Sequence, residues 1–257
     1  MFLIAQKLPY FIKKRLFGDR KKHGIKVDEH DEEWGMWLEQ YNNFYSNTQT
    51  QGIGKFINNS GYKILKNIDF RNKTVLEIGP GSMNHLDIMP NYPEEYIIVD
   101  IDQNFLDLSK QKLDENNIVS RSILIKDRSN AEIDEISNNT VDILLTFYSL
   151  EHLYNLEKYL VEYKKYLKDG GLIVGCVPCE GGLFWGLGRF MTSRRWMKKN
   201  TEIDLDKIIC WEHPNFISTV KKCLDKHFFA KKNNFFPFKI GSGDFNFVFS
   251  FVYQVNK

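Results

Sequence analysis

The chain has 257 residues and a formal net charge of +2, and charged side chains make up 26% of it. This length is enough for one domain with a sizeable hydrophobic core, and the nearly balanced charge gives no support for a nucleic-acid partner. No apolar run reaches the length of a transmembrane helix, and the first eight residues lack the basic start and small-residue cleavage site of a secretory signal. We therefore expect a cytoplasmic protein.

The first predicted helical face is apolar and consists of Ile4, Leu8, Phe11, Ile12 and Leu16. Pro9 interrupts this helix, because proline has no N–H to donate. Two interpretations remain open. The segment packs on the body of the protein or in a dimer, or residues 1–17 make a peripheral contact with an anionic membrane, at its inner face.

A second helical pattern follows and consists of Trp34, Trp37, Leu38, Tyr41, Phe44 and Tyr45. Aromatic residues at this spacing predict a helix that packs on the core of the protein. Residues 1–72 thus form a helical extension before the first predicted strand.

The central stretch of the sequence runs from Thr74 to Met83. Its apolar residues end in glycines, which predicts a buried strand followed by a turn that brings the backbone close to a ligand. Glu77 lies two residues before Gly79, where a carboxylate would repel a pyrophosphate but would suit a cation such as the ammonium group of an amino acid. The third glycine of G-x-G-x-x-G is replaced by Asn84.

Beyond residue 73, apolar runs alternate with helical patterns, which predicts a parallel sheet with crossover helices. We expect strands at 74–78, 96–99, 122–126, 141–147 and 172–177. His85 would belong to the first crossover helix, Asp102 would cap the second, and Gly170 with Gly171 would end the helix that starts near Leu153. The terminal runs 235–240 and 245–253 predict an antiparallel hairpin.

Three landmarks resemble those of the class I methyltransferases that use S-adenosylmethionine. Glu77-x-Gly79-x-Gly81 resembles their motif I, with Met83 in place of the last glycine. Asp100 ends the second strand, nineteen residues after Gly81, as the second landmark requires. The passage from Ser149-Leu-Glu-His-Leu153 to residue 178 resembles the small-molecule branch of that superfamily. The resemblance covers residues 73–178.

The resemblance implies a Rossmann-like, doubly wound α/β fold with a seven-stranded, mostly parallel sheet and a C-terminal antiparallel hairpin. Residues 73–257 would form the methyltransferase domain, with 179–215 inserted as a substrate cover. Residues 1–72 would be a helical extension and a lid over the cofactor.

The resemblance also implies S-adenosylmethionine as cofactor and S-adenosylhomocysteine as product. Asp100 would bind the ribose hydroxyls, Ile101 would lie on the adenine, and Asp127 would contact the adenine amino group. The full set of expected cofactor contacts is Glu77, Gly79, Gly81, Asp100, Ile101, Asp127, Tyr148, Tyr45 and Gln49.

The end of the fourth strand, Thr146-Phe-Tyr-Ser149, lacks the Asn-Pro-Pro-Tyr of amino-nitrogen methylation, and no aspartates of the magnesium-dependent catechol type accompany it. We therefore predict metal-free methylation of oxygen. Cys176 and Cys179 form a C-x-x-C pair, but no second close pair completes a zinc site, so reduced core thiols are expected.

A hydroxyl acceptor needs a general base, and histidine has the suitable pKa. The catalytic candidates are His152, His213 and Glu180, and we also considered His85 and Glu151. His152 lies at the mouth of the fourth strand, where the methyl group would emerge, although packing alone would also account for it.

We predict a small or carrier-linked acceptor, such as a nucleotide-linked sugar or a phosphoramidate. The flanking segments resemble bacterial methyltransferases found with the biosynthesis of surface polysaccharide (capsule or lipopolysaccharide), and Arg189, Arg194 and Arg195 would suit a phosphate. One alternative is a membrane-surface methyltransferase of the quinone or lipid type. The other is a binding or scaffold protein without turnover. No nucleic-acid partner is expected, and the oligomeric state is left open.

Overall fold

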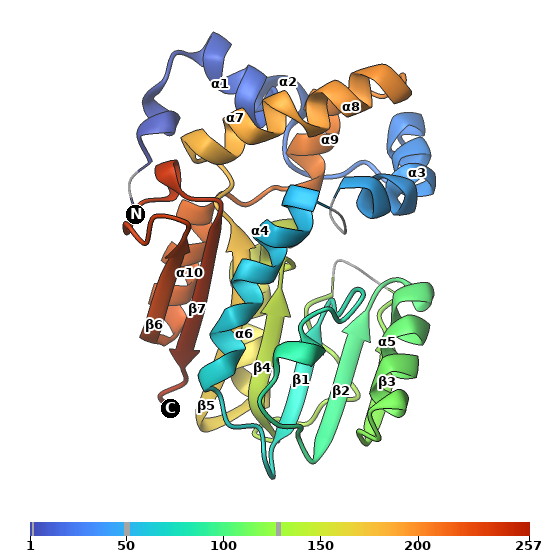
Figure 1. Ribbon diagram of the computed structural model, residues 1–257, viewed down its shortest axis with the longest axis vertical. Helices are drawn as coiled ribbons and strands as arrows, with labels where there is room; N and C mark the ends of the chain where they lie inside the picture. Colours follow the sequence, from blue (N-terminus) through green and yellow to red (C-terminus); the bar gives the residue numbers. More distant parts are fainter. Residues whose placement is uncertain (2, 49–51, 127–129) are drawn as a thin grey trace.

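The structure is a computed structural model that describes residues 1, 3–48, 52–126 and 130–257 (Figure 1). The side chains of residues 41–54 lie outside the described part. Its centre is a seven-stranded sheet with the strand order β3-β2-β1-β4-β5-β7-β6. The strands are β1 (Thr74–Ile78), β2 (Glu95–Asp100), β3 (Ser120–Leu124), β4 (Val141–Phe147), β5 (Leu167–Pro178), β6 (Phe229–Phe236) and β7 (Val248–Gln254).

Strands β1 to β5 pair in parallel, and β7 lies antiparallel between β5 and β6. The predicted fold class, including the antiparallel C-terminal pair, is therefore confirmed. Several predicted boundaries were wrong, since β3 is Ser120–Leu124 and not 122–126, and β7 begins at Val248 and not at residue 245. Two further differences have a clear physical reason. The hairpin begins at Phe229, not at residue 235, and its first strand stops before Pro237, which cannot donate to the ladder. The helix that was to end at Gly170 ends at Tyr166, because Leu167 already pairs with Val141.

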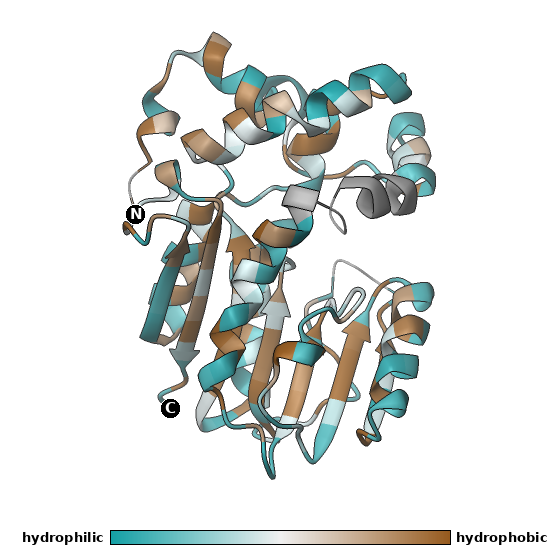
Figure 2. Ribbon diagram, viewed as in Figure 1, coloured by the Kyte–Doolittle hydropathy of each residue, from teal (hydrophilic) through white to brown (hydrophobic). Residues whose placement is uncertain are grey.

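Each face of the sheet carries its own hydrophobic core. In Figure 2, strands inside the sheet such as β2 are largely apolar, whereas the edge strand β6 is largely hydrophilic. Helices α6 (Leu156–Tyr166) and α10 (Ile217–His227) cover one face. The other face is covered by α4 (Gly52–Tyr62), the 3-10 turn η2 (Lys63–Asn67) and α5 (Gln103–Glu115). Burial on both faces explains the near-continuous apolar runs of the central strands.

The connection from β1 to β2 departs from the predicted alternation of strands and helices. It contains only the 3-10 turn η3 (Leu86–Ile88), so His85 does not belong to a crossover helix. Pro80, Pro90 and Pro93 stand in this short connection, and proline inside a helix removes a hydrogen bond and clashes with the preceding turn.

Two segments that are far apart in the sequence form one helical cap beyond the carboxyl ends of the parallel strands (Figure 1). The cap consists of η1 (Ile4–Lys7), α1 (Tyr10–Phe17), α2 (Arg20–His23), α3 (Glu32–Thr48), α7 (Leu183–Met191), α8 (Ser193–Asn200) and α9 (Leu205–Glu212). The N-terminal extension and the predicted substrate cover are thus partners in a single layer.

The cap has hydrophobic cores of its own. Trp34 and Trp37 of α3 pack with Trp211, Met197 and Ile208 of the insertion, and the rings of Trp34 and Trp211 lie 6.1 Å apart. The described part of α3 therefore packs on the insertion, whereas the sequence predicted a contact with the main core. The apolar residues of the insertion supply the partner surface.

Asp244, in the turn η5 (Gly243–Phe245) between β6 and β7, fastens the cap to the sheet. Its buried carboxylate accepts hydrogen bonds from the backbone N–H groups of Ile4 (2.6 Å), Ala5 (3.1 Å) and Leu183 (3.3 Å). Charge-assisted bonds of this kind are among the stronger ones in proteins. The start of the chain and the start of α7 are thereby held at one point.

Within the described residues, no helix has the length and apolar character needed to cross a bilayer.

Candidate active site

The glycine loop after β1 adopts left-handed backbone conformations. Gly79 has φ +68° and Gly81 has φ +54°, which side chains other than glycine rarely tolerate. A Cβ atom on Gly79 would lie 2.8 Å from the Ser149 hydroxyl, so this part of the loop rests against the end of β4. A Cβ on Gly81 would meet no described atom within 4 Å, which leaves room for a ligand beside the loop.

Met83 takes the position of the family's last glycine and is itself left-handed, with φ +47°. Its side chain is buried in the core beneath the loop. Helix α5 holds the loop from the other side, because Ser109 donates a hydrogen bond of 2.9 Å to the Gly81 carbonyl and Lys112 donates to the Ser82 carbonyl. The loop thus keeps a defined shape without the third glycine.

Glu77 is fully buried and only half satisfied. Its Oε2 accepts a hydrogen bond of 2.7 Å from the Tyr96 hydroxyl and lies 3.2 Å from His85 Nε2. Its Oε1 has no hydrogen-bond partner among the described residues. A buried carboxylate oxygen without a partner is costly, and the ammonium group of S-adenosylmethionine would satisfy it. This orphaned atom fits the predicted cofactor.

His85 was considered as a general base, and the structure places it elsewhere. It is almost fully buried, stacks on the Phe147 ring with centroids 5.1 Å apart, and contacts the ring of Tyr62. Its ring nitrogen faces Glu77 and Tyr96. These contacts suit a residue that supports Glu77.

Asp100 lies at the carboxyl end of β2, beside the glycine loop, whose Gly79 N–H donates to the Val99 carbonyl over 2.8 Å. Its Oδ1 accepts the N–H groups of Ile101 (2.7 Å) and Asp102 (3.0 Å), which orients the carboxylate. The side chain of Ile101 is 45% exposed, so its face is available to a ligand. The predicted capping by Asp102 is confirmed, because its carboxylate accepts the N–H of Asn104 at the start of α5.

The remaining expected cofactor contacts are Tyr148, Tyr45, Gln49 and Asp127. Tyr148 is left-handed, with φ +56°, and its hydroxyl donates to the Asn58 carbonyl of α4 over 2.9 Å. This hydroxyl is therefore bound to the helix that covers the sheet. Tyr45 belongs to α3, but its side chain lies outside the described part of the structure, as do Gln49 and Asp127.

The three predicted catalytic residues come together from separate elements. His152 ends the 3-10 turn η4 (Leu150–His152) after β4, Glu180 follows β5, and His213 follows α9. The rings of His152 and His213 meet edge to face with centroids 4.7 Å apart, and His213 Nδ1 lies 2.8 Å from Glu180 Oε2.

Two residues that the sequence did not single out bring His213 to this place. Arg20 of α2 donates hydrogen bonds of 2.6 and 2.8 Å to the carbonyls of His213 and Pro214. Asn215 donates its side-chain amide to the carbonyls of Leu150 and Leu153, on either side of His152. No short-range pattern in the sequence predicts such contacts, since each joins a residue to a distant backbone carbonyl.

Glu180 is fully buried and ionised. Arg189 donates a hydrogen bond to each carboxylate oxygen, from Nη1 to Oε1 over 2.9 Å and from Nη2 to Oε2. Trp185 Nε1 also donates to Oε2 over 2.9 Å. Burial acts to raise the pKa of Glu180, but the charge of Arg189 and the hydrogen bond from His213 outweigh it and hold the pKa below its usual value. Arg189, predicted to suit an acceptor phosphate, is instead engaged by Glu180.

The partners of both histidines define their tautomers. His213 Nδ1 lies 2.8 Å from an oxygen of the ionised Glu180 carboxylate and 3.1 Å from Arg189 Nη2, which already donates to the same carboxylate oxygen. Because the closer carboxylate would repel a lone pair on Nδ1, we assign the hydrogen to Nδ1 and the lone pair to Nε2. His152 Nδ1 lies 2.7 Å from the Glu212 carbonyl, which selects the same tautomer. Burial lowers the pKa of His213 below its usual value, with the charge of His152 acting in the same direction. His213 is therefore neutral at pH 7 and can accept a proton through Nε2.

His152, Glu212 and His213 also offer ligand atoms that lie within 4.8 Å of one another. That spacing is compatible with a single metal ion, since imidazole and carboxylate are common ligands of transition metals. Metal-free chemistry therefore stays a prediction.

Glu151, next to His152, should make the stability of the protein depend on pH. It is almost fully buried, and burial raises its pKa from 4.5 to about 7. Between these pH values the folded chain keeps a proton that the unfolded chain loses, so stability should fall as the pH rises through this window. We expect Glu151→Gln to raise the free energy of unfolding by about 1–3 kcal/mol at pH 8 and to change it little at pH 4.5.

Urea unfolding at both pH values would measure this difference. Glu115→Gln is the matched control, because Glu115 is exposed at the end of α5. An equal effect of Glu151→Gln at pH 4.5 and pH 8 would contradict the elevated pKa.

Comparisons with known proteins agree with this geometry. Residues 76–175 match the protein family described as "Methyltransferase domain". A candidate methyltransferase of Methanocaldococcus jannaschii is 28% identical over 90 residues, which are 34% of each chain, so the match spans about a third of that relative.

Two solved structures share the fold over most of the chain. The CurJ carbon methyltransferase superposes with a TM-score of 0.59 at 16% identity, over 96% of this chain and 67% of its own. The N-methyltransferase NodS of Bradyrhizobium japonicum, solved with S-adenosylhomocysteine, has a TM-score of 0.59 at 12% identity and is covered over its full length, with 88% of this chain. The family match and the shared fold thus agree on a class of protein. Residues 76–175 match a methyltransferase domain, and the chain has the fold of the S-adenosylmethionine-dependent methyltransferases.

Proposed function

We propose that the protein transfers the methyl group of S-adenosylmethionine to a hydroxyl oxygen of a small or carrier-linked acceptor. The observation that carries this proposal is the Glu180–His213 pair. A buried, ionised carboxylate holds an imidazole that is neutral at pH 7, and the Nε2 of this ring has no hydrogen-bond partner among the described residues. A hydroxyl acceptor needs such a base, because the neutral hydroxyl is a weak nucleophile.

The fold alone leaves the acceptor atom open. CurJ is a carbon methyltransferase and NodS an N-methyltransferase, although both share this architecture. Methylation of oxygen therefore rests on the histidine site. Methylation of carbon or nitrogen would be the outcome that overturns it.

In the proposed mechanism, S-adenosylmethionine supplies an electrophilic methyl group, and the protein supplies position, desolvation and a base. Glu77 and Asp100 would hold the cofactor's ammonium and ribose. His213 Nε2 would accept the proton of the acceptor hydroxyl while that oxygen takes the methyl group. Glu180 stabilises the resulting imidazolium, and Arg189 keeps Glu180 ionised and in place. His152 lines the same site through its ring contact with His213.

For the acceptor we propose a nucleotide-linked sugar or a sugar phosphoramidate of a bacterial capsule or lipopolysaccharide pathway. The resemblance of the flanking segments to surface-polysaccharide methyltransferases supports this choice. Arg189 and Arg194 contribute nothing to it, since the first pairs with Glu180 and the second with Asp206.

The test is the formation of S-adenosylhomocysteine by the purified protein with a panel of acceptors. The panel contains nucleotide sugars, sugar phosphates and a phosphoramidate, and mass spectrometry locates the new methyl group. A product methylated on oxygen is expected. Methylation of nitrogen or carbon, or binding of S-adenosylmethionine without turnover of any acceptor, would count against the proposal, and the second result would favour a scaffold role.

A further inference from the structure

The cap presents an apolar stripe on its outer surface. On α7, Leu187, Phe190 and Met191 are three and four residues apart and are all exposed, Met191 by 56%. On α1, Phe11 is exposed by 62% and lies one turn before the exposed Arg15. Residues at these spacings share one face of a helix.

The two helices are packed directly against each other. A Cβ atom on Gly186 of α7 would lie 2.7 Å from the ring of Phe17 of α1, so the backbone of α7 closely approaches α1 at that point. Phe17 and Gly186 are buried, and Phe11 and Met191 are exposed. Both helices thus have an inner face that is used for packing and an apolar outer face that the described chain leaves uncovered.

Cations border this apolar surface. A hollow beside it is lined by Arg15, Phe190, Arg194, Arg195 and Lys198. Asp206 offsets the charge of Arg194. Within the described parts of the chain, no ion pair involves the side chains of Arg15, Arg195 or Lys198.

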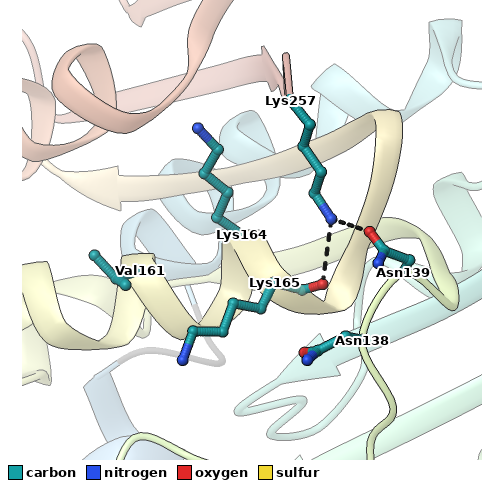
Figure 3. Close-up of a pocket in the computed structure, with 6 residues that line it drawn as sticks. All are labelled: Asn138, Asn139, Val161, Lys164, Lys165 and Lys257. Atoms are coloured by element: carbon teal, nitrogen blue, oxygen red, sulfur yellow. Dashed lines mark hydrogen bonds between the residues drawn. The ribbon is translucent and has the colours of Figure 1, made fainter.

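A second basic hollow, at the opposite end of the molecule, shows a different arrangement (Figure 3). Lys164, Lys165 and Lys257 line it together with Asn138, Asn139 and Val161. Lys165 pairs with Glu162, and Lys257 donates to the side chain of Asn139 and to the Lys165 carbonyl. Among its lining residues, Val161 is the exposed apolar side chain and none is aromatic, so this hollow offers charge beside a smaller apolar surface.

We propose that the outer surface of α1, α7 and α8 docks on an anionic phospholipid membrane. Exposed apolar side chains would enter the headgroup region, and the hollow of Arg15, Arg195 and Lys198 would hold lipid phosphates. Charge complementarity selects this occupant: uncompensated cations beside apolar side chains match an anionic bilayer, which has negative headgroups above hydrocarbon. The surface would place the methyltransferase where lipid-linked acceptors lie.

Co-sedimentation of the full chain with vesicles tests this proposal, with phosphatidylglycerol mixed into phosphatidylcholine and with phosphatidylcholine alone. We expect binding to the anionic vesicles that weakens with salt. Arg195→Glu combined with Lys198→Glu should weaken this binding at least about tenfold. Lys164→Glu with Lys257→Glu is the control of equal charge, and it should stay within about twofold of the unmodified protein.

The apolar contribution has its own pair of variants. Phe11→Ser with Met191→Ser should weaken binding at least about threefold, because both side chains would leave the headgroup region. Leu108→Ser with Val119→Ser removes exposed apolar side chains elsewhere and should have no such effect. Circular dichroism and binding of S-adenosylmethionine verify that each variant is folded.

Three results would overturn the proposal. The first is no binding to anionic vesicles. The second is equal loss in the charge controls, or no loss with Phe11→Ser and Met191→Ser, which would indicate non-specific adsorption. The third is a dimer that dissociates when Met191 is replaced, without vesicle binding, which would make this surface a contact between copies. The measurement needs no methyl acceptor, so its failure is distinguishable from failure of the proposed activity.

Discussion

Replacing His213 with asparagine is expected to lower the rate of methyl transfer by about 100- to 10,000-fold, which is the usual contribution of a general base. Asparagine retains a donor near the position of Nδ1, so the hydrogen bond to Glu180 can persist while the proton acceptor at Nε2 is lost. Turnover of an identified acceptor would be measured by formation of S-adenosylhomocysteine. Binding of S-adenosylmethionine should change little.

The matched variant is His152→Asn, which likewise keeps a donor toward the Glu212 carbonyl and removes Nε2. A larger loss in His152→Asn than in His213→Asn would assign the base to His152. The pH profile gives a second measurement. Because burial lowers the pKa of His213, kcat/KM should rise with pH through an apparent pKa below about 6.5 and then level off.

Asp100→Ala is expected to weaken binding of S-adenosylmethionine by about 100- to 10,000-fold. The reason is the loss of two charge-assisted hydrogen bonds to the ribose, each contributing about 1.5–3 kcal/mol. Calorimetric titration with S-adenosylmethionine and S-adenosylhomocysteine would measure the change, with NAD as a ligand that should not bind.

Asp107→Ala is the control for Asp100→Ala, because Asp107 lies on the exposed side of α5 and accepts a hydrogen bond only from Gln103 among its described neighbours. Asp100 also accepts two backbone N–H groups, so unfolding curves should accompany the titration. Unchanged affinity in a folded Asp100→Ala protein would rule out the ribose contact.

Local patterns were enough to predict the sheet and to bring Glu77, Gly79 and Asp100 to one edge of it. The central strands can be recognised in the sequence as apolar runs, because each is buried on both faces. Glycines mark the loop after β1, because its backbone is left-handed. Glu77, Gly79 and Asp100 stand at short, characteristic distances along the chain. They meet because the carboxyl ends of adjacent parallel strands lie at one edge of the sheet.

The meeting of the candidate catalytic residues depended on contacts that no local pattern contains. His152 and His213 were both candidates from the sequence, but their meeting requires Arg20 and Asn215, which bind backbone carbonyls distant in the sequence. Arg189 was expected to bind a phosphate, and only the folded chain shows that it neutralises Glu180.

The cap illustrates the same division. Amphipathic spacing predicted helices in residues 1–48, and the length of residues 179–215 predicted a cover. Periodicity does not indicate, however, which surface an apolar helix face packs against. Tertiary packing made that choice by placing Trp34 and Trp37 against Trp211 and by fixing both segments to Asp244. Secondary structure and the cofactor loop follow from interactions between near neighbours, whereas the histidine site and the cap follow from long-range burial and hydrogen bonding, which only the complete fold brings about.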